Sequence, residues 1–254
     1  MTHTTVSCGS SADRRRPGRL FAGLALALAV LVLAGCASSS GADGSGTPRP
    51  SARPDERLRQ TISQGLLAEG RQEEARIVAL GGSRLTRVEA PFLRTWAIYR
   101  VDYRQSPHPV QLHVATGGGR VELLTGVPEA FGRVTAADGT AVGDAATAVA
   151  LARAYVETTR PGGVLTYVVG RVEDIEFRPG ITGAAAERRD EILAEYRPRI
   201  KQPAAEASGR GFTATVYAVK DKALQRHDIG VTAKGAVDDR VKTLVPDLPV
   251  PYTL

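Results

Sequence analysis

Cysteine, methionine and tryptophan are nearly absent from this sequence of 254 residues, which contains two cysteines, one methionine and one tryptophan. Cys8 and Cys36 both lie near the start, so no disulfide can form within the part of the chain that follows residue 36. Aromatic residues make up only 5% of the sequence. The stability of the folded part must therefore come mainly from buried aliphatic side chains.

The sequence also lacks the short motifs that usually indicate catalysis or metal binding. It has no Gly-x-Ser-x-Gly turn, no His-x-His or His-Glu-x-x-His pattern and no cysteine pair with metal-ligand spacing. The glycine run at 117–119 is not followed by a lysine or a helix signal and predicts a tight turn. Asp238 and Asp239 lack the spacing of a calcium loop and are expected at a solvated strand end. We therefore expect no enzyme, no cofactor and no metal site.

Three histidines follow residue 36, and each has a simple structural interpretation. His108 stands between two prolines and is expected in a solvated loop. His113 alternates with aliphatic neighbours, which predicts the polar face of a strand. His227 adjoins Asp228 at a predicted strand start and is expected at the surface. A catalytic role would require His113 or His227 to meet a carboxylate in a cleft.

The formal net charge is +6 at pH 7, and the arginines are interleaved with glutamate and aspartate along the chain. A nucleic-acid-binding protein usually gathers its basic residues on one face or segment. We therefore expect no nucleic-acid partner.

The longest apolar run spans residues 21–35 and follows a basic stretch at 14–19. A membrane-spanning helix needs about 20 apolar residues, so this run is short for a span. A basic start, a short apolar core and a small-residue exit are the three parts of a secretory signal. Here the exit reads Leu33-Ala34-Gly35-Cys36.

This exit segment resembles the lipobox of bacterial lipoproteins. The resemblance implies cleavage between Gly35 and Cys36, a diacylglycerol on the Cys36 sulfur, and a site for a further acyl chain such as palmitate on the new amino group. Two acyl chains suffice for durable anchoring. We therefore expect the protein on the extracytoplasmic face of a cell membrane, held by its lipid. Loss of residues 1–35, with four arginines and one aspartate, would lower the net charge to about +3.

Composition divides the remainder of the chain. Residues 36–54 are rich in Ser, Gly and Pro and predict a lipidated cysteine followed by a disordered tether. A first α+β domain is predicted at 55–131, a turn-rich linker at 132–143 and a second α+β domain at 144–254. The second domain is interrupted by an insertion at 179–209.

Each predicted domain begins with a capped helix and continues with strands. Asp55 caps a helix with apolar residues at 58, 62 and 66, and Asp144 caps a helix that ends before 160–163. The insertion contains one further helix at 185–197. The predicted strands are 75–80, 84–89, 96–103, 110–114, 121–123, 164–169, 172–177, 212–219, 228–233 and 236–243.

A common offset of 116 residues separates Trp96 from Phe212 and Gly119 from Gly235, which indicates an internal duplication. The predicted fold class is α+β, with two repeats of one helix followed by a four-stranded antiparallel sheet. This element order is similar to cystatin-like and NTF2-like rolls, which implies a curved sheet around a helix in each half. The alternative is a chance agreement between two unrelated α+β halves.

Most of the few aromatic residues fall on predicted strands, where they are expected to fill the core. In a roll, inward aromatic side chains can instead line a pocket for an apolar ligand. The residues concerned are Trp96, Tyr99, Tyr103, Tyr167, Phe177, Phe212 and Tyr217.

Together these features predict a membrane-anchored extracytoplasmic lipoprotein that acts as a non-catalytic binding or scaffolding module of the cell envelope. Its partners would be the membrane, through the lipid, and an unknown envelope protein. We expect the insertion at 179–209 and the Pro-rich tail at 246–251 to make the contacts, because both depart from the repeat. The alternatives are a carrier of a lipid or other apolar ligand and, third, an envelope hydrolase.

Overall fold

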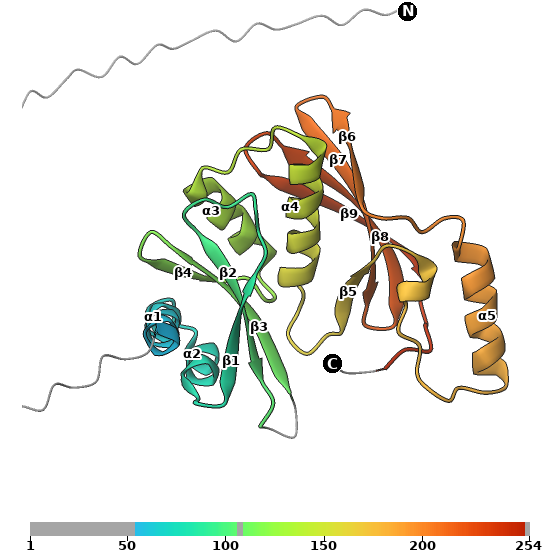
Figure 1. The fold of residues 1–254 in the computed structure, drawn as a ribbon, viewed down its shortest axis with the longest axis horizontal. Coiled ribbons are helices and arrows are strands. Elements are labelled where there is room, and N and C mark those ends of the chain that lie inside the picture. Colours follow the sequence, from blue (N-terminus) through green and yellow to red (C-terminus); the bar gives the residue numbers. More distant parts are fainter. Residues whose placement is uncertain (1–53, 106–108, 252–254) are drawn as a thin grey trace, which may run out of the picture. The chain divides into compact units, whose positions relative to one another are not determined.

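The computed structural model describes residues 54–105 and 109–251, whose ribbon is shown in Figure 1. The predicted cleavage and lipidation site at Gly35 and Cys36, the tether up to residue 53 and His108 lie outside the described residues. The described residues form a mixed α+β fold with two antiparallel sheets, which confirms the predicted fold class at that level. None of their helices is long and apolar enough to cross a membrane.

The first sheet, sheet A, has the strand order β1-β2-β3-β4, and all its neighbours are antiparallel. The β3–β4 turn contains Gly118 and Gly119 with positive φ angles of 56° and 74°, which residues with a side chain rarely adopt. The glycine run is therefore the tight turn that was predicted. The strands are β1 (Ser83–Val88), β2 (Ala97–Tyr103), β3 (Val110–Gly117) and β4 (Arg120–Leu123).

Two helices, α1 (Pro54–Ala68) and α2 (Gln72–Ala79), pack on one face of sheet A. The predicted apolar face of α1 is confirmed, because Ile62 and Leu66 are fully buried against the sheet. The first half therefore has two helices before its sheet, not the single helix that was predicted.

The helix α2 includes residues 75–79, so the strand predicted at 75–80 is wrong. Arg59 of α1 donates hydrogen bonds from Nη1 to the carbonyl oxygens of Val78 at 3.2 Å and Leu80 at 3.0 Å. The last carbonyls of a helix have no partner within the helix, and a basic side chain can satisfy them. This contact stabilises α2 from outside its own sequence, where local periodicity cannot reveal it.

The linker predicted at 132–143 is also wrong in large part, because α3 (Pro128–Asp138) runs through it. Pro128 takes the first helical position, where its missing N–H costs nothing. Gly139 ends the helix with a φ of 67°. Proline at the start and glycine just past the end is a common pair of helix boundaries, so the sequence did carry this signal.

The next helix, α4 (Ala145–Thr158), begins as predicted at Asp144. The Asp144 carboxylate accepts a hydrogen bond from the backbone N–H of Thr147 at 2.8 Å. Its buried residues, among them Leu151 and Ala152, pack into a core that contains Ile98 of sheet A and Val216 of the second sheet. Both predicted domains thus contribute to one core around α4, which lies between the two sheets in Figure 1.

The second sheet, sheet B, has five strands, not the predicted four. Its order is β5-β7-β8-β9, with β6 also paired to β7. Because β8 pairs along the whole of β7, β5 and β6 share the opposite edge of β7, one at each end. The strands are β5 (Thr166–Val169), β6 (Ala204–Ser208), β7 (Gly211–Lys220), β8 (Ala223–Thr232) and β9 (Val237–Val245).

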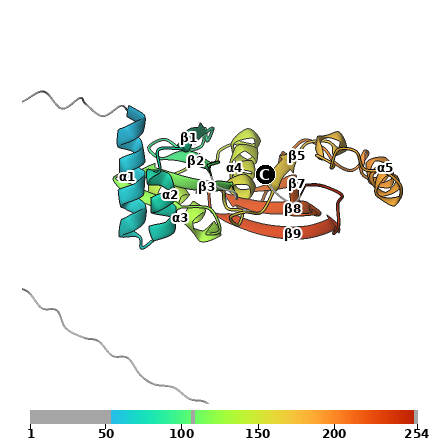
Figure 2. The ribbon, with the colours of Figure 1, turned by 90° about the horizontal axis from the view of Figure 1, so that it is seen from below.

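The insertion predicted at 179–209 lies between β5 and β7 and includes β6. The strand predicted at 172–177 is wrong: the short 3₁₀ helix η1 (Val172–Asp174) begins there, and the Asp174 carboxylate accepts the Gly170 N–H at 2.9 Å. The helix α5 (Ala184–Tyr196) confirms the helix expected at 185–197. Ile192 and Tyr196 of α5 share a separate core with residues of sheet B, and Figure 2 shows α5 beyond that sheet from α4.

Candidate functional site

A pocket of about 160 Å³ lies on the face of sheet B that α4 covers. The strand register places His227 there, because His227 pairs with Val216 on β7, a residue of the core around α4. Asp239 on β9 pairs with Ile229, which belongs to the same core. The turn before α3 and the C-terminal end of α4 complete the lining. The pocket therefore gathers polar side chains of four strands, Thr166 of β5, Lys220 of β7, His227 of β8 and Asp239 of β9.

His227 and Asp239 form a buried hydrogen-bonded pair in this pocket. The His227 Nδ1 atom lies 2.9 and 3.1 Å from the two Asp239 carboxylate oxygens. The side chains are 6% and 13% exposed, respectively. Burial of a carboxylate and an imidazole costs free energy unless the two are paired, which this geometry provides.

The pairing fixes the tautomer of the neutral imidazole. An ionised carboxylate can only accept a hydrogen bond, so Nδ1 of His227 must donate. The other ring nitrogen, Nε2, then carries a lone pair and acts as an acceptor. Nε2 is buried and has no hydrogen-bond partner among the residues that the structure describes. The His227 side chain at the pocket therefore carries a buried acceptor without a partner.

The hydroxyl groups of the two threonines in the pocket are already engaged with backbone carbonyls. Thr159 Oγ donates to the Tyr155 carbonyl at 2.7 Å, and Thr166 Oγ donates to the Val164 carbonyl at 3.4 Å. Burial, with Asp239 nearby, raises the pKa of the Tyr155 phenol, which therefore remains protonated at neutral pH. None of these hydroxyls bonds His227 Nε2. The arrangement lacks the activated nucleophile of a Ser-His-Asp triad.

Two cations contribute to the lining, Arg160 and Lys220. Arg160 is 3% exposed and donates to the Val164 carbonyl at 2.6 Å and to the Gln111 side chain. Burial lowers the pKa of Arg160, which nevertheless stays charged at neutral pH. The Lys220 ammonium group makes no hydrogen bond or ion pair with another described residue. With His227 neutral, the lining carries two positive charges against the one negative charge of Asp239.

The surface positions predicted for His227 and Asp239 are therefore wrong. The sequence does contain the pattern that places them. Alternate residues of β8 read His227, Ile229, Val231, and alternate residues of β9 read Val237, Asp239, Val241. Side chains two residues apart share one sheet face. A histidine and an aspartate in two such apolar series predict a polar pair on a buried face.

His113, the other histidine weighed for catalysis, lies elsewhere. It shares a sheet face with Arg100, Asp102 and Gln111, as the alternation predicted, but it is 5% exposed, so the surface role expected for it is wrong. Burial, with Arg160 and Arg100 nearby, lowers the pKa of His113 to about 3. It pairs with Arg100 on the face of sheet A opposite to α1 and α2, whereas His227 lies on the α4 face of sheet B. Only His227 meets a carboxylate at hydrogen-bonding distance in a pocket.

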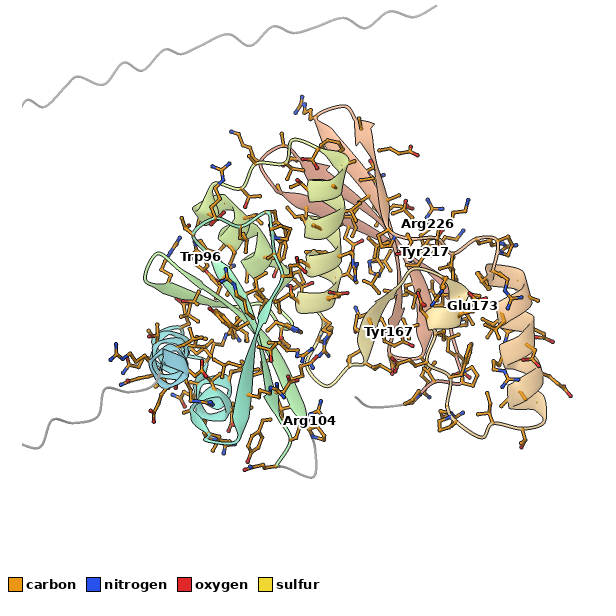
Figure 3. All side chains as sticks on the ribbon, viewed as in Figure 1. Trp96, Arg104, Tyr167, Glu173, Tyr217 and Arg226 are labelled. Atoms are coloured by element: carbon orange, nitrogen blue, oxygen red, sulfur yellow. The ribbon has the colours of Figure 1, made fainter. Side chains whose placement is uncertain are left out.

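The aromatic side chains mostly pack into cores. Trp96 is 4% exposed in the core around α4 and lies beneath the Arg120 guanidinium, 5.3 Å from the ring centroid. Tyr167 and Tyr217 pack against the core beneath α5, on the sheet B side that also carries Arg226 (Figure 3). The Glu176 N–H donates to the Tyr167 hydroxyl at 2.9 Å.

No group of three or more His, Cys, Asp or Glu side chains within 54–105 and 109–251 is placed to hold a metal ion. Comparisons of the chain with protein-family models, curated sequences and solved structures find no match. The assignment of a function therefore depends on the chemistry of the pocket and on the sequence.

Proposed function

We propose that the protein is a lipid-anchored, extracytoplasmic component of the bacterial cell envelope that binds a small polar ligand without transforming it. The anchor is the diacylglycerol expected on Cys36. The observation that carries the binding role is the buried Nε2 atom of His227, which accepts no hydrogen bond from the described residues and belongs to a side chain at the pocket. An unsatisfied buried acceptor costs about 1–3 kcal/mol, which a ligand with a matching donor recovers.

The lining supports a polar ligand over the lipid or other apolar ligand considered as the alternative. An apolar occupant would leave His227 Nε2 unsatisfied and would remove water from Lys220. Trp96, one of the aromatic residues considered for an apolar pocket, is 4% exposed and packs in the core around α4.

We further propose that the two halves of the fold are repeats of one unit, each with two helices before an antiparallel sheet. A shift of 115 residues carries the pair Val101–Leu112 onto the pair Val216–His227. A shift of 116 residues carries Leu123, the partner of Val114, onto Asp239, the partner of Ile229. The strand β1 corresponds in this scheme to β5 and β6 together, separated by the insertion.

This correspondence supports a functional role for the pocket. In the first half, the two matching positions are held by Leu112 and Leu123, which are 6% and 7% exposed in an apolar core. The second half has a histidine and an aspartate there. A buried polar pair is generally no more stable than well-packed aliphatic residues of similar size. Ligand binding would explain why such a pair occupies these positions.

A second candidate is hydrolysis, because a histidine held by a carboxylate is the acid–base unit of many hydrolases. His227 would remove a proton from a bound water molecule. The engaged threonine hydroxyls favour binding over covalent catalysis, since neither bonds Nε2. Scaffolding of an envelope protein through α5 and its flanking segments is compatible with either function.

The anchor is tested by expression of the full chain in a bacterium fed an alkyne analogue of palmitate. We expect the analogue on the protein and the protein in the membrane fraction. Cys36→Ser should abolish both, because the substituted side chain lacks the sulfur that receives the lipid. Cys8→Ser is the matched control and should change neither. Equal membrane association of the Cys36→Ser variant would contradict the lipid anchor.

The binding role is tested by native mass spectrometry of the full chain purified from its membrane in detergent. We expect a small non-covalent adduct on the wild type and its loss in His227→Phe, which removes the acceptor and fills part of the pocket. His113→Phe is the control for replacing a buried histidine elsewhere. An adduct that persists in His227→Phe would place the ligand outside this pocket.

A further inference from the structure

We propose that the ligand of the His227 pocket is a small oxyanion that carries its own hydroxyl group, such as hydrogen phosphate or a short α-hydroxy acid. This inference rests on the proposed binding function and specifies its ligand. The hydroxyl donates to His227 Nε2, and the anionic oxygens accept from the cationic side of the lining.

The requirement for a hydroxyl follows from the His227–Asp239 pair. With Nδ1 committed to the carboxylate at 2.9 Å, Nε2 of the neutral ring accepts and cannot donate. A fully deprotonated anion would place an acceptor against this acceptor. Sites with buried polar groups discriminate strongly against ligands that leave those groups unpaired.

The requirement for negative charge follows from the rest of the lining. Lys220 and Arg160 exceed Asp239 by one positive charge. Gly126 and Pro128 bring the N-terminus of α3 to the pocket, and this helix of 11 residues has no side-chain cap there. The N-terminal end of a helix carries a partial positive charge that favours anions.

The C-terminal end of α4, which also borders the pocket, has hydrogen-bond donors of its own. The Tyr155 carbonyl, in the last turn of α4, accepts from the Thr159 N–H at 3.1 Å and from the Thr159 hydroxyl at 2.7 Å. This carbonyl is therefore occupied. On the α3 side, the Gly126 N–H donates to the Arg160 carbonyl at 2.9 Å and Pro128 has no N–H, so Lys220 is the donor that remains for the ligand.

The volume limits the size of the ligand. The pocket measures about 160 Å³, whereas drug-sized ligands occupy cavities of about 300 Å³ or more. Since a water molecule takes about 30 Å³ in the liquid, the pocket has room for about five waters or a similar number of heavy atoms. Phosphate and lactate are of this size.

The test uses two pairs of probes that differ mainly in the hydroxyl. Isothermal titration of the full chain in detergent would compare inorganic phosphate with sulfate, and lactate with propionate, at constant pH and ionic strength. Phosphate bears a proton at neutral pH and sulfate does not. We expect at least one pair to show a preference of about tenfold or more for the hydroxylated member. A preference for phosphate over sulfate indicates a phosphate site, and a preference for lactate over propionate indicates a hydroxy-acid site.

Three variants separate the roles of the side chains. His227→Phe should remove the preference, and Asp239→Asn should reduce it, because the neutral amide no longer fixes the tautomer. Lys220→Met should weaken binding of both members of a pair by about tenfold and leave their ratio unchanged. Lys234→Met, at an exposed position outside the pocket, is the charge-matched control and should bind as the wild type does.

Equal affinity for both members of each pair, or no binding of any of the four probes, would overturn this proposal. Neither result would remove the adduct expected by native mass spectrometry, so failure of the ligand class is distinguishable from failure of the binding function. A thermal unfolding curve for each variant confirms that it is folded, and the comparison of probes on the wild type does not depend on any variant.

Discussion

Replacement of the His227–Asp239 pair by leucines gives the sharpest test of how this pocket is built. The three variants are His227→Leu, Asp239→Leu and the double variant, which recreates the aliphatic pair found at Leu112 and Leu123 in the first half. If the halves are repeats, the double variant restores an arrangement that the fold already accommodates.

The expected magnitudes follow from the burial of the pair. His227→Leu leaves the Asp239 carboxylate, 13% exposed, without its partner and should destabilise the protein by about 3–5 kcal/mol. Asp239→Leu leaves two ring nitrogens of His227 without partners and should cost about 2–4 kcal/mol. The double variant removes both polar groups and should range from neutral to about 4 kcal/mol more stable than the wild type.

The assay is urea unfolding of the full chain in detergent, followed by circular dichroism, with oxyanion binding measured on the same samples. The free energies of the two single variants should not add, and the coupling should far exceed the roughly 0.5 kcal/mol error of additivity. All three variants should lose the hydroxyl preference. A double variant that is as unstable as the sum of the single variants would refute both the energetic coupling of the pair and the proposed correspondence with Leu112 and Leu123.

Three further predictions concern stability. Burial lowers the pKa of His113 to about 3 from 6.5, so between these pH values the unfolded chain binds a proton that the folded chain does not. The free energy of unfolding should therefore fall by about 1.4 kcal/mol per pH unit on acidification below 6.5. His113→Leu should flatten that part of a plot of urea midpoint against pH. Burial alone would raise the pKa of Asp138, but hydrogen bonds from residues 94–96 hold this pKa below its usual value. The contribution of Asp138 to stability is therefore present above the pKa of the unfolded state and is lost as the pH falls through the pKa of the folded state. At neutral pH, Asp138→Ala should lower the free energy of unfolding by about 3–5 kcal/mol, whereas an unchanged urea midpoint would show that this carboxylate is dispensable. Gly211→Ala would press a Cβ against the Val231 carbonyl oxygen and should lower the free energy of unfolding by about 1–3 kcal/mol, read from the urea midpoint. Gly180→Ala, where only the φ of 70° opposes a side chain, is the comparison.

Elements with a strong local pattern could be predicted from the sequence. The helix after Asp144 has its cap and an apolar face in the sequence, and both are present in the structure. The strands at β2 and β7 have clear alternation and were expected within a few residues of their bounds. In these segments, local propensity and tertiary packing favour the same conformation.

Other elements depend on contacts that lie far away in the sequence. The run at 75–80 is short and apolar, and periodicity alone does not separate a buried strand from a helix of that length. Its helical form is supported by Arg59, which reaches the carbonyl oxygens of Val78 and Leu80. The strand β6 is made of small residues with weak β-propensity and exists because β7 offers an unpaired edge beside β5.

The candidate site was missed because the histidines were judged by their immediate neighbours. Asp228 follows His227 in sequence, but the strand alternation directs it to the opposite face of sheet B, where it bonds Arg226 at 2.8 Å. The true partner, Asp239, lies 12 residues away on the next strand. Which residue of β9 pairs with His227 depends on the β8–β9 register, because a one-residue slip would move every side chain of the strand to the other sheet face.

The shared core around α4 has a consequence for how this protein resists proteolysis. Proteases cut chains that open locally, and a domain joined to another by a simple linker can open alone. Here Ile98 from one half and Val216 from the other pack into one cluster with α4. Separation of the halves would expose that cluster, so both halves are expected to open together in one costly step, and a cut within 132–143 would require melting of α3.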